Sequence, residues 1–261
     1  MSLDSFVIRG KKRASGGEVC SSETRGSGKK RKVEDVKSSD DKSQLPWKKL
    51  RAENLDLDYV RLYSKKEADD LLKELENALE YNTGHLARVQ MFGKWIDIPR
   101  KQVAHGEAGL SYTFSGNTIP ARPWNPALTR IRDYISSVTG FDFNFVLVNR
   151  YKDGCDYMGE HKDDEKDLVQ GYPIASLSLG QPRDFYFKHQ DSRGKNAARK
   201  IDIVKLELEH GGLLLMNPPT NQFWYHALPQ RKKLGNVRIN MTFRKMNPSV
   251  CKPVKQGISP K

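Results

Sequence analysis

Apolar side chains recur at helical spacing in two stretches, and both stretches carry helix-boundary signals. The first follows Ser64-Lys-Lys-Glu67, a capping box that satisfies two free backbone N–H groups. The second follows Asn125-Pro126, a capping residue before a proline, and stops at Gly140. Two core-facing helices are predicted, with these apolar stripes: Leu71, Leu72, Leu75 and Leu79, then Leu128, Ile131, Ile135 and Val138.

After Gly140 the pattern changes to short strands. The segments with strand character are 142–151, 174–180, 184–188, 201–208, 212–216 and 237–244. A run of strands after two helices predicts an α+β domain, in which the N-terminal helices pack on one sheet of a β-sandwich or jelly-roll.

The last predicted strand, 237–244, alternates apolar and polar side chains over its whole length. Its polar face carries Arg238 and Arg244, which lie about 20 Å apart along the strand at a rise of ~3.3 Å per residue. Two long side chains at this spacing can converge on a small molecule between them. A five-carbon diacid fits, because a guanidinium binds carboxylate in bidentate fashion. Either arginine alone would instead suit a solvated strand face.

His161, Asp163 and the distant His226 form a candidate metal site. Two imidazoles and one carboxylate can hold Fe(II) on one face and leave positions open for O2 and a co-substrate. In extended backbone His161 and Asp163 leave the same side of the strand, so His226 must come from another strand or strand end. A surface histidine beside the acidic run 163–167 would show the same spacing. The two arginines of the last strand are what favour the metal centre.

Polar groups also continue the apolar face of strand 142–151. Asn149 and Tyr151 follow three apolar residues on this face, as expected where a core gives way to a ligand site. Asn149 could equally cap the turn before Asp153-Gly154. This segment alone leaves both interpretations open.

Four motifs together resemble the AlkB family of Fe(II)/2-oxoglutarate dioxygenases, and the likeness covers roughly Pro46 to Met246. The motifs are Asn149-Arg150-Tyr151, His161-x-Asp163, His226 and Arg238-Ile-Asn-Met-Thr-Phe-Arg244. The resemblance implies a double-stranded β-helix with the metal between its sheets. It implies Fe(II) on His161, Asp163 and His226 as the catalytic centre. The co-substrate 2-oxoglutarate would be held by Asn149, Tyr151, Arg238, Thr242 and Arg244.

The implied activity is DNA repair by oxidative demethylation of 1-methyladenine and 3-methylcytosine, preferentially in double-stranded DNA. The enzyme would flip the base, consume O2 and 2-oxoglutarate, and release formaldehyde and succinate. A base whose pairing is blocked by methylation is a few kcal/mol cheaper to extrude. The alternatives are a dioxygenase of the same fold that acts on RNA or protein, and a non-catalytic DNA-binding module. The complete set of metal and co-substrate residues argues against the module.

A segment at about 85–120 resembles the family's nucleotide-recognition part. Phe92, beside Lys94 at a turn, suits insertion into a base stack, although it could equally pack beneath a hairpin. A flipped cationic base would be favoured by aromatic faces and a carboxylate. Asp164 matches the family position that bonds the exocyclic amine, or is a solvated acid. The expected substrate contacts are Phe92, Gly93, Lys94, Tyr112, Thr113, Phe114 and Asp164.

Basic residues are expected to contact the DNA backbone. The net charge is +13, and residues 1–45 hold 11 Lys and Arg against 7 Asp and Glu, so most of the excess belongs to the remainder. In similar proteins the positions matching Lys188, Gly194 and Lys195 grip the undamaged strand, although loop 188–200 could be a solvated hairpin loop. The expected contacts, which should be salt-sensitive and sequence-independent, are Arg100, Lys101, Lys188, Arg193, Gly194 and Lys195.

The two ends of the chain are expected to be tails around a dioxygenase domain at 46–246. Residues 1–45 should be a disordered basic tail, and 247–261 a second tail. Lys29-Lys-Arg-Lys-Val33 is a basic run of the nuclear-import type, or an arm that attracts phosphate, and it predicts the nucleus. Ser5-Phe-Val-Ile-Arg9 resembles the motif by which repair proteins bind the sliding clamp, here through Phe6. Ser5 departs from the Lys or Arg that normally starts that motif.

Three cysteines without a CxxC motif indicate a reducing compartment and no disulfide framework. The chain has no apolar stretch of membrane-span length and no signal-peptide apolar core, so no membrane association is expected. The protein is expected to be a monomer.

Overall fold

The structure is a computed structural model that describes residues 45–251, except 92, 115–116, 164 and 196. Several positions singled out above therefore lie outside the described residues. They are the tail up to residue 44, with Phe6 and the basic run 29–33, then Phe92, Asp164, and the chain from residue 252 onward. Within the described part of the chain, no helix is long and apolar enough to cross a membrane.

The first predicted helix forms with the capping box that its sequence indicates. Helix α1 (Lys65–Ala78) begins at Ser64, whose hydroxyl accepts the N–H of Glu67. The Glu67 carboxylate in turn accepts the N–H of Ser64 at 2.8 Å. The apolar stripe buries Leu75 and Leu79.

The second predicted helix is confirmed as well. Helix α2 (Pro126–Thr139) begins at Asn125, whose Oδ1 accepts the N–H of Leu128 at 2.8 Å. It ends at Gly140, whose φ of 77° lies in the left-handed region that favours glycine. Its inward face buries Leu128, Ile131 and Ile135.

Seven antiparallel strands form the larger sheet, in the order β1-β2-β13-β10-β15-β8-β5. Their bounds are β1 Lys48–Ala52, β2 Leu55–Arg61, β5 Lys101–Gly106, β8 Phe145–Tyr151, β10 Ile174–Gly180, β13 Gly212–Asn217 and β15 Arg238–Arg244. The strand with the two predicted arginines, β15, therefore lies in the interior of the sheet.

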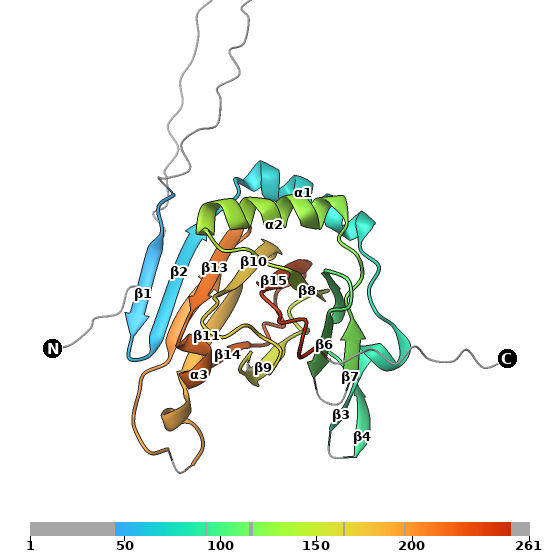
Figure 1. Ribbon diagram of the computed structural model, residues 1–261. Coiled ribbons are helices and arrows are strands. Elements are labelled where there is room, and N and C mark those ends of the chain that lie inside the picture. Colours follow the sequence, from blue (N-terminus) through green and yellow to red (C-terminus); the bar gives the residue numbers. More distant parts are fainter. Residues whose placement is uncertain (1–44, 92, 115–116, 164, 196, 252–261) are drawn as a thin grey trace, which may run out of the picture. The chain divides into compact units, whose positions relative to one another are not determined.

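The smaller sheet has the order β12-β11-β14-β9. Its strands are β9 Met158–His161, β11 Arg183–His189, β12 Val204–Leu208 and β14 Trp224–Leu228. Two separate hairpins pair β3 Arg88–Met91 with β4 Lys94–Asp97, and β6 Ser111–Phe114 with β7 Asn117–Pro120. The short helical turns are η1 Gly84–Ala87, η2 Gln190–Ser192 and α3 Thr220–Phe223. In Figure 1 the β3–β4 hairpin extends away from α1 and α2.

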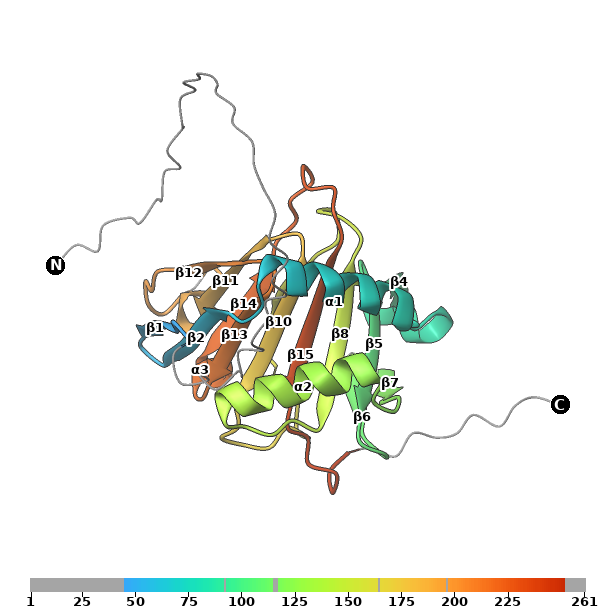
Figure 2. The ribbon, with the colours of Figure 1, turned by 90° about the horizontal axis from the view of Figure 1, so that it is seen from above.

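Among the described residues, two of the three hydrophobic clusters lie on opposite faces of the larger sheet. One joins it to the helices and contains Leu75, Ile131 and Met241. The other joins the two sheets and contains Leu214 on β13 and Trp224 on β14. Figures 1 and 2 show α1 and α2 crossing the outer face of the larger sheet, with the smaller sheet on its other side. This is the predicted α+β arrangement, with helices on one sheet of a double-stranded β-helix.

Strand β15 is buried on both faces. Its apolar residues Ile239, Met241 and Phe243 belong to the core beneath the helices. Its polar residues face the smaller sheet, and each has an exposed fraction between 2% and 8%: Arg238, Asn240, Thr242 and Arg244. A solvated strand face is therefore wrong for these arginines.

Strand boundaries differ from the predictions where side chains bond the backbone. The segment predicted from residue 142 becomes a strand only at Phe145, because Asn144 turns toward another segment. Its amide donates to the carbonyl of Met246 at 2.9 Å and accepts the N–H of Met246 at 2.7 Å. The strands within 48–61, 88–106 and 117–120 were not predicted, although the apolar residues Leu55, Leu57 and Tyr59 of β2 alternate with aspartates. The strand expected at His161 is present but ends there, before Asp163, and His226 lies on another strand as expected.

Truncation of Leu75 should lower the free energy of unfolding by about 2–5 kcal/mol. Leu75 is fully buried between α1 and the larger sheet, so Leu75→Ala leaves a cavity. Urea denaturation of this variant and of Lys73→Ala, on the exposed face of the same helix, gives the comparison. Equal losses in the two variants would contradict the assignment of the buried face.

Candidate metal centre and co-substrate pocket

The smaller sheet brings the three predicted metal ligands together. His161 ends β9 and is paired across the sheet with His226 of β14, and their ring centroids are 4.2 Å apart. Asp163 follows β9. Its Oδ1 lies 3.8 Å from His161 Nε2, and its Oδ2 lies 3.7 Å from His226 Nε2. One ligand atom from each residue lies within 4.8 Å of the others. The predicted juxtaposition is thus present.

The hydrogen bonding and burial of the two histidines fit a metal ion. His161 Nδ1 lies 2.9 Å from the carbonyl of Gly159, which accepts only, so Nδ1 carries a proton and Nε2 is the atom left for a metal. Burial lowers the pKa of His226 to about 3, so its ring is neutral near pH 7. Its Nδ1 has no hydrogen-bond partner among the described residues. Two imidazoles and a carboxylate suit Fe(II).

Arg244 holds the carboxylate of Asp163. Its Nη2 donates to Asp163 Oδ1 at 2.8 Å, and its Nη1 donates to Glu165 Oε1 at 3.2 Å. Burial by itself would raise the pKa of Asp163, but attraction to the Arg244 guanidinium opposes it and the pKa falls. The ligand therefore stays ionised. Contact between Arg244 and the co-substrate stays a prediction.

Arg238, at the other end of the same strand face, is in a different electrostatic state. Its Nη2 donates to the hydroxyl of Ser178 at 2.9 Å, and its Cζ lies 5.2 Å from the ring centroid of Tyr151. No carboxylate of a described residue forms an ion pair with it, and its Nε has no partner there. Burial lowers its pKa to about 10, so it remains a cation. A buried cation without a carboxylate suits an anionic ligand.

A cavity of about 810 Å³ connects the metal ligands with Arg238. Its volume lies at the upper end of the range for small-molecule sites, so it can take more than a five-carbon diacid. The wall includes all five residues predicted to hold the co-substrate: Asn149, Tyr151, Arg238, Thr242 and Arg244.

The sequence analysis missed further polar residues of this wall. Asn240, between Arg238 and Thr242, donates to the hydroxyl of Ser176 at 2.8 Å and accepts from Thr242 at 3.3 Å. Ser176 and Ser178 lie on β10 beside β15. The alternation in 174–180 placed both serines on one face, and this signal could have found them. Glu165, which had no predicted role, also lines the cavity, and burial raises its pKa.

Of the predicted substrate contacts, the ones that the structure describes lie on the β3–β4 and β6–β7 hairpins. Gly93, with φ 76°, forms the turn beside the exposed Lys94. Tyr112 and Thr113 line the cavity, and the Tyr112 ring centroid lies 5.0 Å from Arg244 Cζ. Phe114 ends β6. Their roles toward a base stay predictions.

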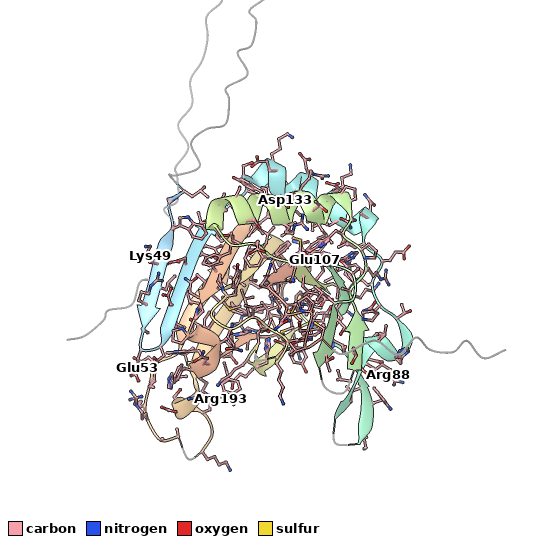
Figure 3. All side chains as sticks on the ribbon, in the orientation of Figure 1. Lys49, Glu53, Arg88, Glu107, Asp133 and Arg193 are labelled. Atoms are coloured by element: carbon pink, nitrogen blue, oxygen red, sulfur yellow. The ribbon has the colours of Figure 1, made fainter. Side chains whose placement is uncertain are left out.

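The predicted DNA-backbone residues lie in two groups. Arg100 lines the cavity and its Nε donates to Asn149 Oδ1 at 2.9 Å, whereas Lys101 is exposed. In the second group, the Nε of Arg193 donates to Glu160 Oε2 at 2.9 Å, and Lys188 Nζ lies 3.9 Å from Glu160 Oε1. Gly194 and Lys195 are exposed. Figure 3 places Arg193 and, on the β3–β4 hairpin, Arg88 at the end of the folded unit away from α1 and α2.

Comparisons with known proteins agree with this geometry. The family described as the 2OG-Fe(II) oxygenase superfamily matches residues 57–244. The chain is 57% identical over 215 residues to DNA oxidative demethylase ALKBH2 of Mus musculus, covering 82% of this chain and 87% of the relative. It is 59% identical over 200 residues to the protein of the same name from Homo sapiens, covering 77% of each.

More distant relatives share the fold. Alpha-ketoglutarate-dependent dioxygenase alkB homolog 3 of Homo sapiens is 34% identical over 189 residues, covering 70% of this chain and 63% of the relative. The solved structure of OsALKBH1 superposes with a TM-score of 0.52 at 15% identity, covering 77% of this chain and all of that one. At this identity the superposition supports the fold alone.

Replacement of Asp163 by Asn should weaken Fe(II) binding at least ~10–100-fold. A loss of this size is typical even for groups that only form hydrogen bonds to a metal ligand. The shape is kept, but the charge between the two imidazoles is lost. Anaerobic titration with Fe(II) measures the affinity. Asp184→Asn removes an exposed carboxylate on β11 and should bind like wild type. Unchanged affinity in Asp163→Asn would contradict the ligand assignment.

The two arginines of β15 should respond oppositely to replacement by methionine. Arg238→Met removes a buried cation with no carboxylate partner among the described residues, so the ligand-free protein should be at least as stable as wild type. Arg244→Met leaves Asp163 and Glu165 without their partner and should lower the free energy of unfolding by about 3–5 kcal/mol.

Thermal denaturation with and without 2-oxoglutarate measures both effects. Added 2-oxoglutarate should raise the Tm of wild type and should have little effect on Arg238→Met. Equal destabilisation of the two ligand-free variants would show that the electrostatic contrast between these arginines is wrong.

Proposed function

The chain belongs to the 2OG-Fe(II) oxygenase superfamily, and from that membership we propose that it repairs alkylated DNA by oxidative demethylation. Its cofactor is Fe(II), and 2-oxoglutarate and O2 are co-substrates. The observation that carries the proposal is 57–59% identity to two DNA oxidative demethylases over most of the chain. The metal ligands and the buried cation Arg238 line the same cavity.

The proposed division of labour follows the charges in the cavity. His161, Asp163 and His226 hold the metal ion, while Arg238 takes the distal carboxylate of 2-oxoglutarate. The bound metal, with 2-oxoglutarate and O2, supplies the oxidising power that hydroxylates the N-methyl carbon, so that formaldehyde, succinate and CO2 are released.

Hydrogen-bond donors orient the co-substrate. The amide of Asn149 and the hydroxyl of Tyr151 lie on the same wall as Arg238. Asn240 donates to Ser176 and to the carbonyl of Leu177, and it accepts from Thr242, so these side chains are already fixed before a ligand binds. Side chains fixed in this way lose little freedom when the ligand arrives.

We propose 1-methyladenine and 3-methylcytosine in duplex DNA as the substrates. Both bases are cationic near neutral pH, and their weak pairing makes extrusion cheaper. The ring of Tyr112 and the carboxylate of Glu165 line the cavity next to the metal ligands and favour a cationic ring. Phe92 would fill the gap in the stack. Arg100, Lys101 and the basic residues of loop 188–200 would hold the backbone through salt-sensitive contacts.

The two ends of the chain would also serve DNA repair. We propose that the catalytic domain spans 46–246 between two tails, and that run 29–33 directs a monomeric enzyme to the nucleus. The motif around Phe6 would bind the sliding clamp. Equal clamp pull-down by wild type and Phe6→Ala would exclude the last proposal.

Formaldehyde release from 1-methyladenine oligonucleotides tests the function. Wild type should act on duplex more than on single strands, and omission of iron should abolish release from both. Phe92→Ala should impair the duplex reaction far more, because only a duplex has a stack to fill. An equal loss of activity on both substrates would contradict the insertion of Phe92 into the base stack. Activity on RNA or protein alone would favour the alternative substrates.

A further inference from the structure

Arg100 connects the β3–β4 hairpin to the cavity wall that contains Asn149. It lies between β4 and β5, next to Ile98 and Pro99 at the cavity. Its Nε donates to Asn149 Oδ1 at 2.9 Å, and Asn149 is buried on β8 with an exposed fraction of 2%. Arg100 was expected to contact a DNA phosphate, and it contacts Asn149, a residue expected to bind the co-substrate.

This contact fixes the orientation of the Asn149 amide. A guanidinium has five N–H donors and no acceptor, so the atom facing Arg100 must be the amide oxygen. The NH2 of Asn149 is then directed elsewhere. It has no hydrogen-bond partner among the described residues, although it is not sealed from the cavity that Asn149 lines. A donor is therefore presented where an anionic ligand is expected.

The alternative amide orientation would oppose ligand binding. The carboxylates and the keto oxygen of 2-oxoglutarate all accept hydrogen bonds, so an amide oxygen turned toward them would repel the ligand. Without a neighbour that discriminates oxygen from nitrogen, the amide could adopt both orientations. Across the sheet, Asn149 is paired with Gln102 and Asn240, and no bond between their side chains and its amide is present. Among the described residues, Arg100 is the one that discriminates.

We propose that Arg100 is a positioning residue for 2-oxoglutarate, which acts by holding the Asn149 amide with its NH2 toward the co-substrate. The inference rests on the proposed function, because it presumes that 2-oxoglutarate occupies this cavity. It differs from a phosphate contact in one decisive respect: the effect of Arg100 must persist when no DNA is present.

The test is a double-mutant cycle on 2-oxoglutarate binding without DNA. Anaerobic calorimetry on the Fe(II)-loaded full chain compares wild type, Arg100→Ala, Asn149→Ala and the double variant. Each single variant should bind 2-oxoglutarate about tenfold more weakly, as expected for loss of one hydrogen bond to a charged group. The double variant should be no weaker than Asn149→Ala, because Arg100 acts through that amide.

Two further variants separate positioning from general effects of charge. Lys152→Ala removes an exposed cation that directly follows β8, and this variant should bind 2-oxoglutarate like wild type. Arg100→Lys keeps a side chain that only donates and should recover part of the affinity. In turnover, Arg100→Ala should raise the KM for 2-oxoglutarate more than it lowers kcat.

Wild-type affinity in Arg100→Ala would overturn the inference, and so would losses that multiply in the double variant. An equal loss in Lys152→Ala would show an effect of charge alone and would also overturn it. If wild type itself fails to bind 2-oxoglutarate, the proposed function falls instead, and the two failures are distinct.

Discussion

The ion pair between Arg244 and Asp163 is the contact on which the candidate site depends. Asp163 follows β9 of the smaller sheet and Arg244 ends β15 of the larger one, so the pair joins the two sheets at the metal centre. Both side chains are buried, where either charge alone would cost several kcal/mol. Because the same carboxylate faces both imidazoles, assembly of the metal ligands is coupled to the packing of the sheets.

The two arginines of β15 show how one strand face can serve two purposes. Arg244 forms ion pairs with Asp163 and Glu165, whereas no carboxylate of a described residue pairs with Arg238. The strand therefore carries a paired cation at the metal ligands and a cation without a carboxylate partner among the described residues at its other end. Under the proposed function, a carboxylate of the co-substrate that neutralises Arg238 would recover part of the cost of burying it.

Much of the fold could be predicted, because local signals agree with it. The capping box at Ser64, the cap at Asn125 and the stop at Gly140 define both helices by contacts within a few residues. The alternation of 237–244 gave the polar face of β15, and the spacing of His161 and Asp163 gave two ligands. Strand β5 was missed because its pairing with the distant β8, and not its own pattern, makes it a strand.

By itself the sequence determined the helices, the arginine-bearing strand and the types of side chain at the site. Only the tertiary structure decided that Arg244 belongs to Asp163, that Ser178 holds Arg238, and that Arg100 contacts Asn149. Each of these pairs joins residues at least 49 positions apart. Periodicity states which face of an element a residue occupies, whereas contact between elements depends on strand register and on which sheet stacks above which. Those are properties of the packed molecule, because the free energy that selects them comes from burial shared among distant segments.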